Sequence, residues 1–165
     1  MRILLPTDLA PISAPAIEYA GELAARLGAS VHVLHILDHL LAPTVAWATP
    51  AAAAVDLRAR LYADARRAVH GVAAGLGASG LTVQEEVCAG NPAAEILRAA
   101  CETHSDLIVM ATHGRSGLAR LVLGSTAEHV VKHSPCPVIT LSEPVGSALA
   151  AGGEPYEARA RGVSA

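Results

Sequence analysis

Residues 106–126, DLIVMATHGRSGLARLVLGST, decide the fold. The apolar run DLIVM leads into a loop with glycines at 114, 117 and 124, which is followed by Ser125 and Thr126. This order predicts a buried strand, then a loop, then a helix that begins near Ser125. Glycines let another molecule come close to the main chain, because they carry no side chain. The stretch therefore predicts a strand-to-helix junction that a ligand can approach.

The same alternation of apolar runs and helical patterns extends through the rest of the chain. We expect strands at 2–6, 30–38, 81–87, 106–112 and 136–141. We expect helices from Pro11 to Gly28, from about 53 to between 71 and 77, from Asn91 onward, and over 125–133, with a loop at 39–52. Strands that alternate with helices are typical of a mainly parallel sheet with helices on both faces. The polar third strand is expected at a sheet edge.

Helical periodicity predicts which side chains face the core. The expected core positions are Ile17, Ala20, Ala24 and Leu27 in the first helix, Val55, Leu57, Leu61, Ala65 and Ala68 in the second, and Ile96, Leu97 and Ala100 in the third. Asn91 suits the N-cap of the third helix, and Pro92 suits its first turn.

Composition narrows the class of protein. The chain has 165 residues, 52% hydrophobic and 2% aromatic, with a net charge of −3. The charge argues against binding to a nucleic-acid backbone, and the lack of aromatic residues argues against stacking on single-stranded bases. Three cysteines, an odd number, favour a reducing, cytoplasmic setting. The most apolar loop, 41–55, is broken by prolines and too short to cross a membrane.

Two regions are expected along the chain. Residues 1–143 form one α/β domain of sufficient length for a core. Residues 144–165 lack a strong period and contain several helix and strand breakers, so we expect a flexible C-terminal tail.

Two strand ends carry unusual residues: Pro6-Thr7-Asp8 after the first strand and the segment 111–114 after the fourth. If these strands are neighbours, both ends line one crevice, which is where open parallel sheets bind ligands. Gly124, Ser125 and Thr126 would then open a helix whose N-terminus attracts a phosphate. A purely structural role is also open, because Ser125 with Glu128 matches a helix-capping box and the glycines can serve tight turns alone.

These segments resemble the universal stress protein family over residues 1–142. The segments that carry the resemblance are ILLPTD, LHILD, GNPAAEIL and DLIVMATHGRSGLARLVLGSTAEHVVKHSPCPVITL. Nucleotide-binding members carry the motif G-x2-G-x9-G-[ST]. Gly114, Gly124 and Ser125 match this motif, whereas Ala111 stands at the position of the first glycine and adds one methyl group.

The resemblance implies a Rossmann-like fold of the adenine nucleotide alpha hydrolase type: an open five-stranded parallel sheet in the order 3-2-1-4-5, with helices on both faces. It implies a stress-response regulatory protein that binds ATP, or AMP or ADP, with Mg²⁺ possible at the phosphates. It also implies a homodimer joined through the last strand, Pro137 to Leu141, and a regulatory protein partner that the sequence does not name.

Site residues follow from the same resemblance. Those implied at the adenine and ribose are Pro6, Thr7, Asp8, Ile36, Met110 and Ala111. Those implied at the phosphates are His113, Gly114, Arg115, Gly124, Ser125 and Thr126. Asp8 has a second interpretation as the N-cap of the following helix. We favour the ligand role, because Pro11 and two further residues separate Asp8 from that helix.

Chemistry beyond binding finds little support in the sequence. His129 and His133 are spaced to share a metal ion on a helix, but no third ligand is evident, so no metal site is assigned. Ser125 with His113 lacks a third group to orient the histidine, so no catalytic residue is assigned. Slow ATP hydrolysis would need Asp8 to hold a metal, Arg115 to meet a phosphate and His113 to position water.

Two alternatives to a nucleotide-binding regulator stay open. One is an ATP-cleaving or adenylating enzyme of the related alpha-hydrolase group. Such enzymes usually carry S-G-G-x-D-S after the first strand, where this chain has PTDLAPIS. The second is a ligand-free dimerisation scaffold, which only Ala111 favours.

Overall fold

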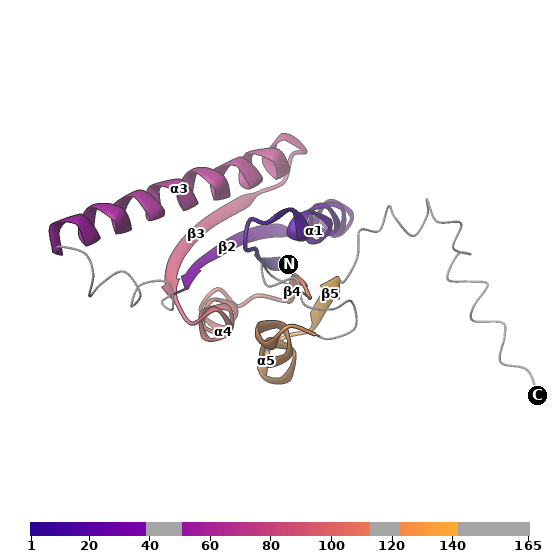
Figure 1. The fold of residues 1–165 in the computed structure, drawn as a ribbon. Coiled ribbons are helices and arrows are strands. Elements are labelled where there is room, and N and C mark those ends of the chain that lie inside the picture. The colour runs from indigo at the N-terminus through magenta and orange to yellow at the C-terminus, as the bar shows by residue number, and fades with distance from the viewer. Residues whose placement is uncertain (39–50, 113–122, 142–165) are drawn as a thin grey trace, which may run out of the picture.

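Five parallel strands form a single sheet in the order β3-β2-β1-β4-β5 (Figure 1). The structure is a computed structural model and describes residues 1–38, 51–112 and 123–141. The strands are β1 (Arg2–Pro6), β2 (Ser30–Asp38), β3 (Val83–Gly90), β4 (Leu107–Ala111) and β5 (Val138–Leu141). The expected fold class and strand order are confirmed, and so is the position of the polar third strand at an edge.

Helices cover both faces of the sheet (Figure 1). They are α1 (Ala14–Leu27), α3 (Ala51–Ala78), α4 (Pro92–Glu102) and α5 (Ser125–His133), and a short 3-10 helix, η1 (Pro11–Ser13), precedes α1. Side chains of α1 and α3 share one hydrophobic cluster with one face of the sheet, and side chains of α4 and α5 share a second cluster with the opposite face.

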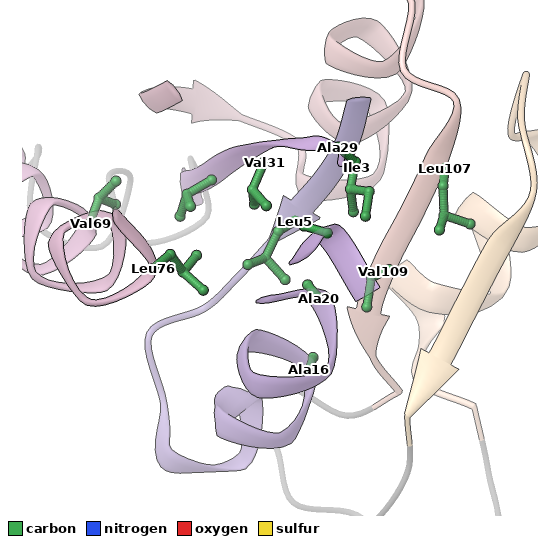
Figure 2. Packing of buried hydrophobic residues seen from close by; sticks show 12 residues of the cluster. Ile3, Leu5, Ala16, Ala20, Ala29, Val31, Val69, Leu76, Leu107 and Val109 are labelled. Carbon is green, nitrogen blue, oxygen red and sulfur yellow. The ribbon is translucent and has the colours of Figure 1, made fainter. Parts of the chain in front are cut away.

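The core is built almost entirely from aliphatic side chains. In the first cluster, Ala16 and Ala20 of α1 and Val69 of α3 pack against strand residues such as Leu5 and Val109 (Figure 2). The central strands are buried on both faces, which is why their sequences are apolar runs without alternation. The small side chains of the buried alanines on α1 allow this helix to lie close to the sheet.

Local signals set the ends of two helices as the sequence predicts. Gly28 ends α1 in the left-handed conformation, with φ 61°, where a side chain would be strained. The side chain of Asn91 accepts a hydrogen bond from the Ala94 N–H at 3.1 Å, which confirms its N-cap role at α4.

Gly21 permits a close approach of α1 and α3, because an added Cβ would lie 2.8 Å from Cδ2 of Leu76.

The second helix departs from the sequence-based expectation. Of its five expected core residues only Ala65 is buried, whereas Ala68 is exposed and Val55, Leu57 and Leu61 keep 70%, 40% and 48% of their surface exposed. The reason is length: α3 has 28 residues and β3 has 8, so the N-terminal half of α3 extends beyond the sheet (Figure 1). Leu27, at the end of α1, is likewise half exposed.

The helices are not of the membrane-spanning kind. In the described part of the chain none is both long enough and apolar enough to cross a bilayer, α3 included.

Candidate functional site

The carboxyl ends of the neighbouring strands β1 and β4 lie at one edge of the sheet. Registered pairing between them covers Ile3 with Leu107 and Leu4 with Ile108. β1 then continues to Pro6 and β4 to Ala111 without a registered partner across this seam. β2, the next strand along the chain, lies on one side of β1, whereas β4 lies on the other side. The strand order therefore reverses between β1 and β4, and open parallel sheets bind ligands at such a switch point.

The loop after β1 is held by its own side chains. The Thr7 hydroxyl accepts a hydrogen bond from the Leu9 N–H at 3.0 Å. One carboxylate oxygen of Asp8, Oδ1, accepts from the Ala10 N–H at 3.0 Å and from the Ser13 hydroxyl at 2.5 Å. Leu9 takes a left-handed conformation, with φ 61°, which a leucine adopts only when its surroundings hold it there.

The second carboxylate oxygen of Asp8 has a different environment. Oδ2 is buried, and none of the described residues donates a hydrogen bond to it. A buried polar atom without a partner costs free energy, and a ligand, ion or water that donates to it recovers that cost. The alternative interpretation of Asp8 as the N-cap of the following helix is wrong, because the N-cap residues of η1 and α1 are Ala10 and Ser13, and neither side chain caps its helix. Oδ1 of Asp8 instead holds the loop, and Oδ2 is left for another group.

The start of α5 lies at the same edge of the sheet. Gly124 is the N-cap residue, and its N–H donates to the Thr112 carbonyl at 2.9 Å, which joins the end of β4 to the beginning of α5. None of the described side chains caps the helix. The first N–H groups of a helix have no partner inside it, so those of Ser125 and Thr126 are left for an anion.

The capping-box interpretation of Ser125 and Glu128 is wrong. Ser125 is the first helical residue rather than the N-cap, so its hydroxyl is out of place for capping. Glu128 accepts a hydrogen bond from Lys132 at 2.6 Å one turn later, and this ammonium group lowers the pKa of Glu128. The carboxylate therefore faces along the helix rather than back toward its N-terminus.

The remaining predicted site residues differ in how much of each is exposed to a ligand. Met110 is buried, with 5% of its surface exposed, and packs in the second hydrophobic cluster, so only its main chain is left for a ligand. Ala111 is half-buried beside the first cluster, and Ile36 is half-buried beside the second. Pro6 is buried at the end of β1. His113, Gly114 and Arg115, predicted at the phosphates, lie outside the described residues.

Sequence reasoning missed two residues that the structure brings to this loop. Ser13 follows Asp8 by five positions, and its contact depends on the turn between them. The sequence assigns no role to His35, yet its Nδ1 lies 2.8 Å from the Thr7 carbonyl oxygen. Neither contact has a local sequence signal, because the first depends on the conformation of the turn and the second on how the ends of β1 and β2 meet.

The histidines at the end of α5 contact each other. The rings of His129 and His133 stack with centroids 4.2 Å apart, and Nδ1 of His133 contacts the His129 carbonyl oxygen at 2.8 Å. Across the described segments, no set of three or more His, Cys, Asp or Glu side chains could hold a metal ion. These two histidines therefore interact with each other and with the end of their own helix.

A polar network lies under α4, on the opposite face of β2 from His35. His32 is buried, and its Nε2 lies 3.1 Å from Glu86 of β3. Arg98 of α4 donates to Glu86 and Glu95, each at 2.7 Å, and also to Glu102. These carboxylates raise the pKa of Arg98, whereas burial lowers the pKa of His32 more than Glu86 raises it.

The lowered pKa of His32 predicts a pH dependence of stability. His32 takes up a proton at a higher pH in the unfolded chain than in the folded chain. The neutral form of His32 therefore contributes to the stability of the fold fully above the ordinary histidine pKa, and this stabilisation is lost as pH falls through the pKa of the folded chain. We expect the urea midpoint of unfolding to be lower at pH 5.5 than at pH 7.5, and this difference to be smaller in His32→Asn. Exposed His104 has φ 51°, which asparagine tolerates, so His104→Asn should behave like the wild type. Equal falls in all three proteins would contradict the role of His32.

Comparison with known proteins identifies the family. The model of the universal stress protein family matches residues 1–142. The chain belongs to the universal stress protein family. A family member from Methanocaldococcus jannaschii is 33% identical over 144 residues, which cover 87% of this chain and 82% of the relative. The family named from the sequence is thus confirmed.

Solved structures of the family share the fold. The universal stress protein UspA from Lactobacillus plantarum has a TM-score of 0.73 at 28% identity, covering 86% of this chain and 97% of its own. A universal stress protein solved in complex with cAMP has a TM-score of 0.62 at 22% identity, with 86% and 95% coverage. The Archaeoglobus fulgidus protein solved in complex with dAMP has a TM-score of 0.61 at 20% identity, with 85% and 96% coverage.

Proposed function

We propose that this protein is a regulatory protein of the stress response that binds an adenine nucleotide, with ATP as the first candidate and AMP or ADP as alternatives. The observation that carries the proposal is the buried Oδ2 of Asp8, which has no partner among the described residues and lies just beyond the carboxyl end of β1. A ligand at this edge of the sheet would find an acceptor after β1 and the free first N–H groups of a helix at the start of α5. A nucleotide carries both the donors and the anion that these groups require.

The chemistry of the two ends orients the ligand. An ionised carboxylate only accepts hydrogen bonds, so Oδ2 of Asp8 requires a donor such as a ribose hydroxyl or an exocyclic amine. A phosphate would be repelled there and is attracted to the N-terminus of α5, where N–H groups and the helix dipole favour negative charge. The nucleoside therefore lies toward β1, and the phosphates lie toward Gly124, Ser125 and Thr126.

Relatives support the choice of adenine. Two solved family structures contain cAMP and dAMP, which share the adenine base and a phosphate but differ in the sugar. We propose that a triphosphate would extend toward His113 and Arg115, with Mg²⁺ bound mainly by the phosphates themselves. Mg²⁺ prefers such phosphate oxygens and retained waters to an all-protein cage.

We further propose that turnover is slow or absent. The hydroxyls of Thr7 and Ser13 hold the loop itself: that of Thr7 accepts from Leu9, and that of Ser13 donates to Asp8. The sequence also offers no complete catalytic set, since Ser125 with His113 lacks a third group to orient the histidine. A phosphate-release assay tests this, since a rate above about 1 s⁻¹, ordinary for an enzyme, would favour the ATP-cleaving alternative.

Homodimerisation through β5 is part of the proposal. β5 is at the sheet edge, and its residues Val138, Ile139 and Leu141 are only half-buried, so a second copy could pair with this edge and cover them. Sedimentation equilibrium tests it: a mass near 16.8 kDa, that of one chain, at micromolar concentration would refute the dimer.

The free thiols of Cys88, Cys101 and Cys136 support the proposed cytoplasmic setting.

Titration calorimetry tests nucleotide binding directly. We expect heat of binding with ATP, ADP or AMP, and adenine nucleotide in the mass spectrum of small molecules released from freshly purified protein. CTP is the control, because it carries the same triphosphate on a different base. If ATP and AMP both gave no heat at millimolar concentration, the proposed function would be wrong. Equal binding of CTP would argue for a phosphate site without base recognition.

A further inference from the structure

His35 of β2 makes a buried contact with the loop that carries Asp8. Its side chain is 6% exposed, and Nδ1 lies 2.8 Å from the carbonyl oxygen of Thr7. A carbonyl oxygen only accepts hydrogen bonds, so Nδ1 must carry the proton and donate. The contact therefore selects one tautomer of the neutral ring, with the proton on Nδ1 and a lone pair on Nε2.

Thr7 is held from several directions at once. Its N–H donates to the Leu34 carbonyl at 2.9 Å, which extends the pairing of β1 with β2 by one residue. Its carbonyl oxygen accepts from His35, and its hydroxyl accepts from the Leu9 N–H at 3.0 Å. Two of these three contacts anchor Thr7 to β2, and the third begins the turn that follows.

The direction of the Asp8 carboxylate depends on this anchor. Asp8 follows Thr7 immediately, and Leu9 after it has the positive φ of 61°. A turn with a left-handed leucine persists only while neighbouring contacts hold it. Oδ1 of Asp8 accepts from the Ala10 N–H and from the Ser13 hydroxyl. With Thr7 fixed as well, the carboxylate has little freedom to turn, so the direction of Oδ2 depends on both sets of contacts.

We propose that His35 is a positioning residue for the nucleotide: its Nδ1–H holds the Thr7 carbonyl and so keeps the free oxygen of Asp8 directed at the ligand. This inference rests on the proposed function, because it concerns the same site. His35 itself touches the loop and acts on the ligand through it. Preorganised acceptors bind more tightly than mobile ones, because no ordering cost arises on binding.

Three substitutions separate the hydrogen bond from mere packing. His35→Leu fills a similar volume without a donor, and we expect ATP affinity to fall about 10-fold, the effect of roughly one lost buried hydrogen bond. His35→Asn places an amide N–H near the position of Nδ1, and we expect affinity within about 3-fold of the wild type. His35→Gln carries its amide one methylene farther out, so we expect it to resemble His35→Leu.

Affinity is measured by titration calorimetry with ATP, and folding of each variant by circular dichroism and its thermal midpoint. His32→Asn is the matched control: His32 is a buried histidine of the same strand on the opposite face, and its loss should leave ATP affinity unchanged. Long-range ¹H–¹⁵N correlation spectra of the imidazole ring provide an independent readout. They should show the Nδ1–H tautomer for His35 in the ligand-free wild type.

The outcomes divide cleanly. Weak binding by the leucine and glutamine variants with rescue by asparagine supports the inference. ATP affinity unchanged in His35→Leu, equal losses in the asparagine and glutamine variants, or an Nε2–H tautomer overturns it while the proposed function stands. If His35→Leu does not fold, the comparison of asparagine with glutamine decides. Absence of ATP binding by the wild type refutes the proposed function, whereas the tautomer is still read from the spectrum.

Discussion

A Gly124→Leu variant is expected to bind ATP at least about 100-fold more weakly than the wild type, because two or more charge-assisted hydrogen bonds to phosphate would be lost. The N–H groups of Ser125 and Thr126 begin a helix that no described side chain caps, and a leucine side chain at its N-cap would occupy the space beside them. Gly124 has φ −59° and ψ 149°, which any residue adopts, so α5 should form normally. Titration calorimetry measures the loss.

The control for this variant is Gly77→Leu. Gly77 lies in α3, and an added Cβ there meets no heavy atom of the described residues within 4 Å, so the same substitution should leave ATP affinity unchanged. Thermal midpoints of both variants show whether either is misfolded. ATP affinity in Gly124→Leu equal to that of the wild type would place the phosphates elsewhere and favour a ligand-free scaffold.

An Asp8→Asn variant is expected to bind ATP about 10- to 30-fold more weakly, the effect of a lost hydrogen bond to a charged acceptor. Asparagine can retain the oxygen that accepts from Ala10 and Ser13, so the loop should persist. In place of Oδ2 it offers an amide N–H, which would face the donor that the ligand presents. Calorimetry with ATP and with AMP measures the change.

The sign of this effect identifies the neighbour of Asp8. If a phosphate lay beside the carboxylate, removal of the negative charge would strengthen binding rather than weaken it. Ser13→Ala is the comparison, because it removes one of the two contacts to Oδ1 and keeps the charge of Asp8. The Ala10 N–H contact remains, so we expect a lower thermal midpoint and a smaller loss of ATP affinity than in Asp8→Asn. Unaltered affinity in Asp8→Asn would restrict Asp8 to its structural role in the loop.

Most of the fold was predictable because its signals are local. Apolar runs gave the strands, Gly28 and Asn91 gave helix ends, and the resemblance gave the strand order. α3 was less predictable, since helical periodicity continues through Val55 and Leu61 although the sheet below them ends. Periodicity shows which face of a helix is apolar, but only the lengths of neighbouring elements show how much of that face is covered.

The candidate site was predictable only in part, for a related reason. Asp8 and Gly124 were found because each follows or precedes an element with a clear signal. The role of His35 depends on the register that places Leu34 beside Pro6, and no local pattern contains that register. Met110 was expected beside the nucleoside, and alternation along β4 directs its side chain into the core, so only its main chain can meet this expectation, which stays a prediction.

The hydrogen bond from Gly124 to the Thr112 carbonyl has an evolutionary consequence. It brings the two ends of the intervening stretch together, so that β4 and α5 are joined whatever lies between them. Loop closure costs little more when a loop lengthens, so insertions, deletions and exchanges there leave the sheet intact. Descendants of one ancestral scaffold can therefore diverge in ligand preference at this point while inheriting the same stable framework.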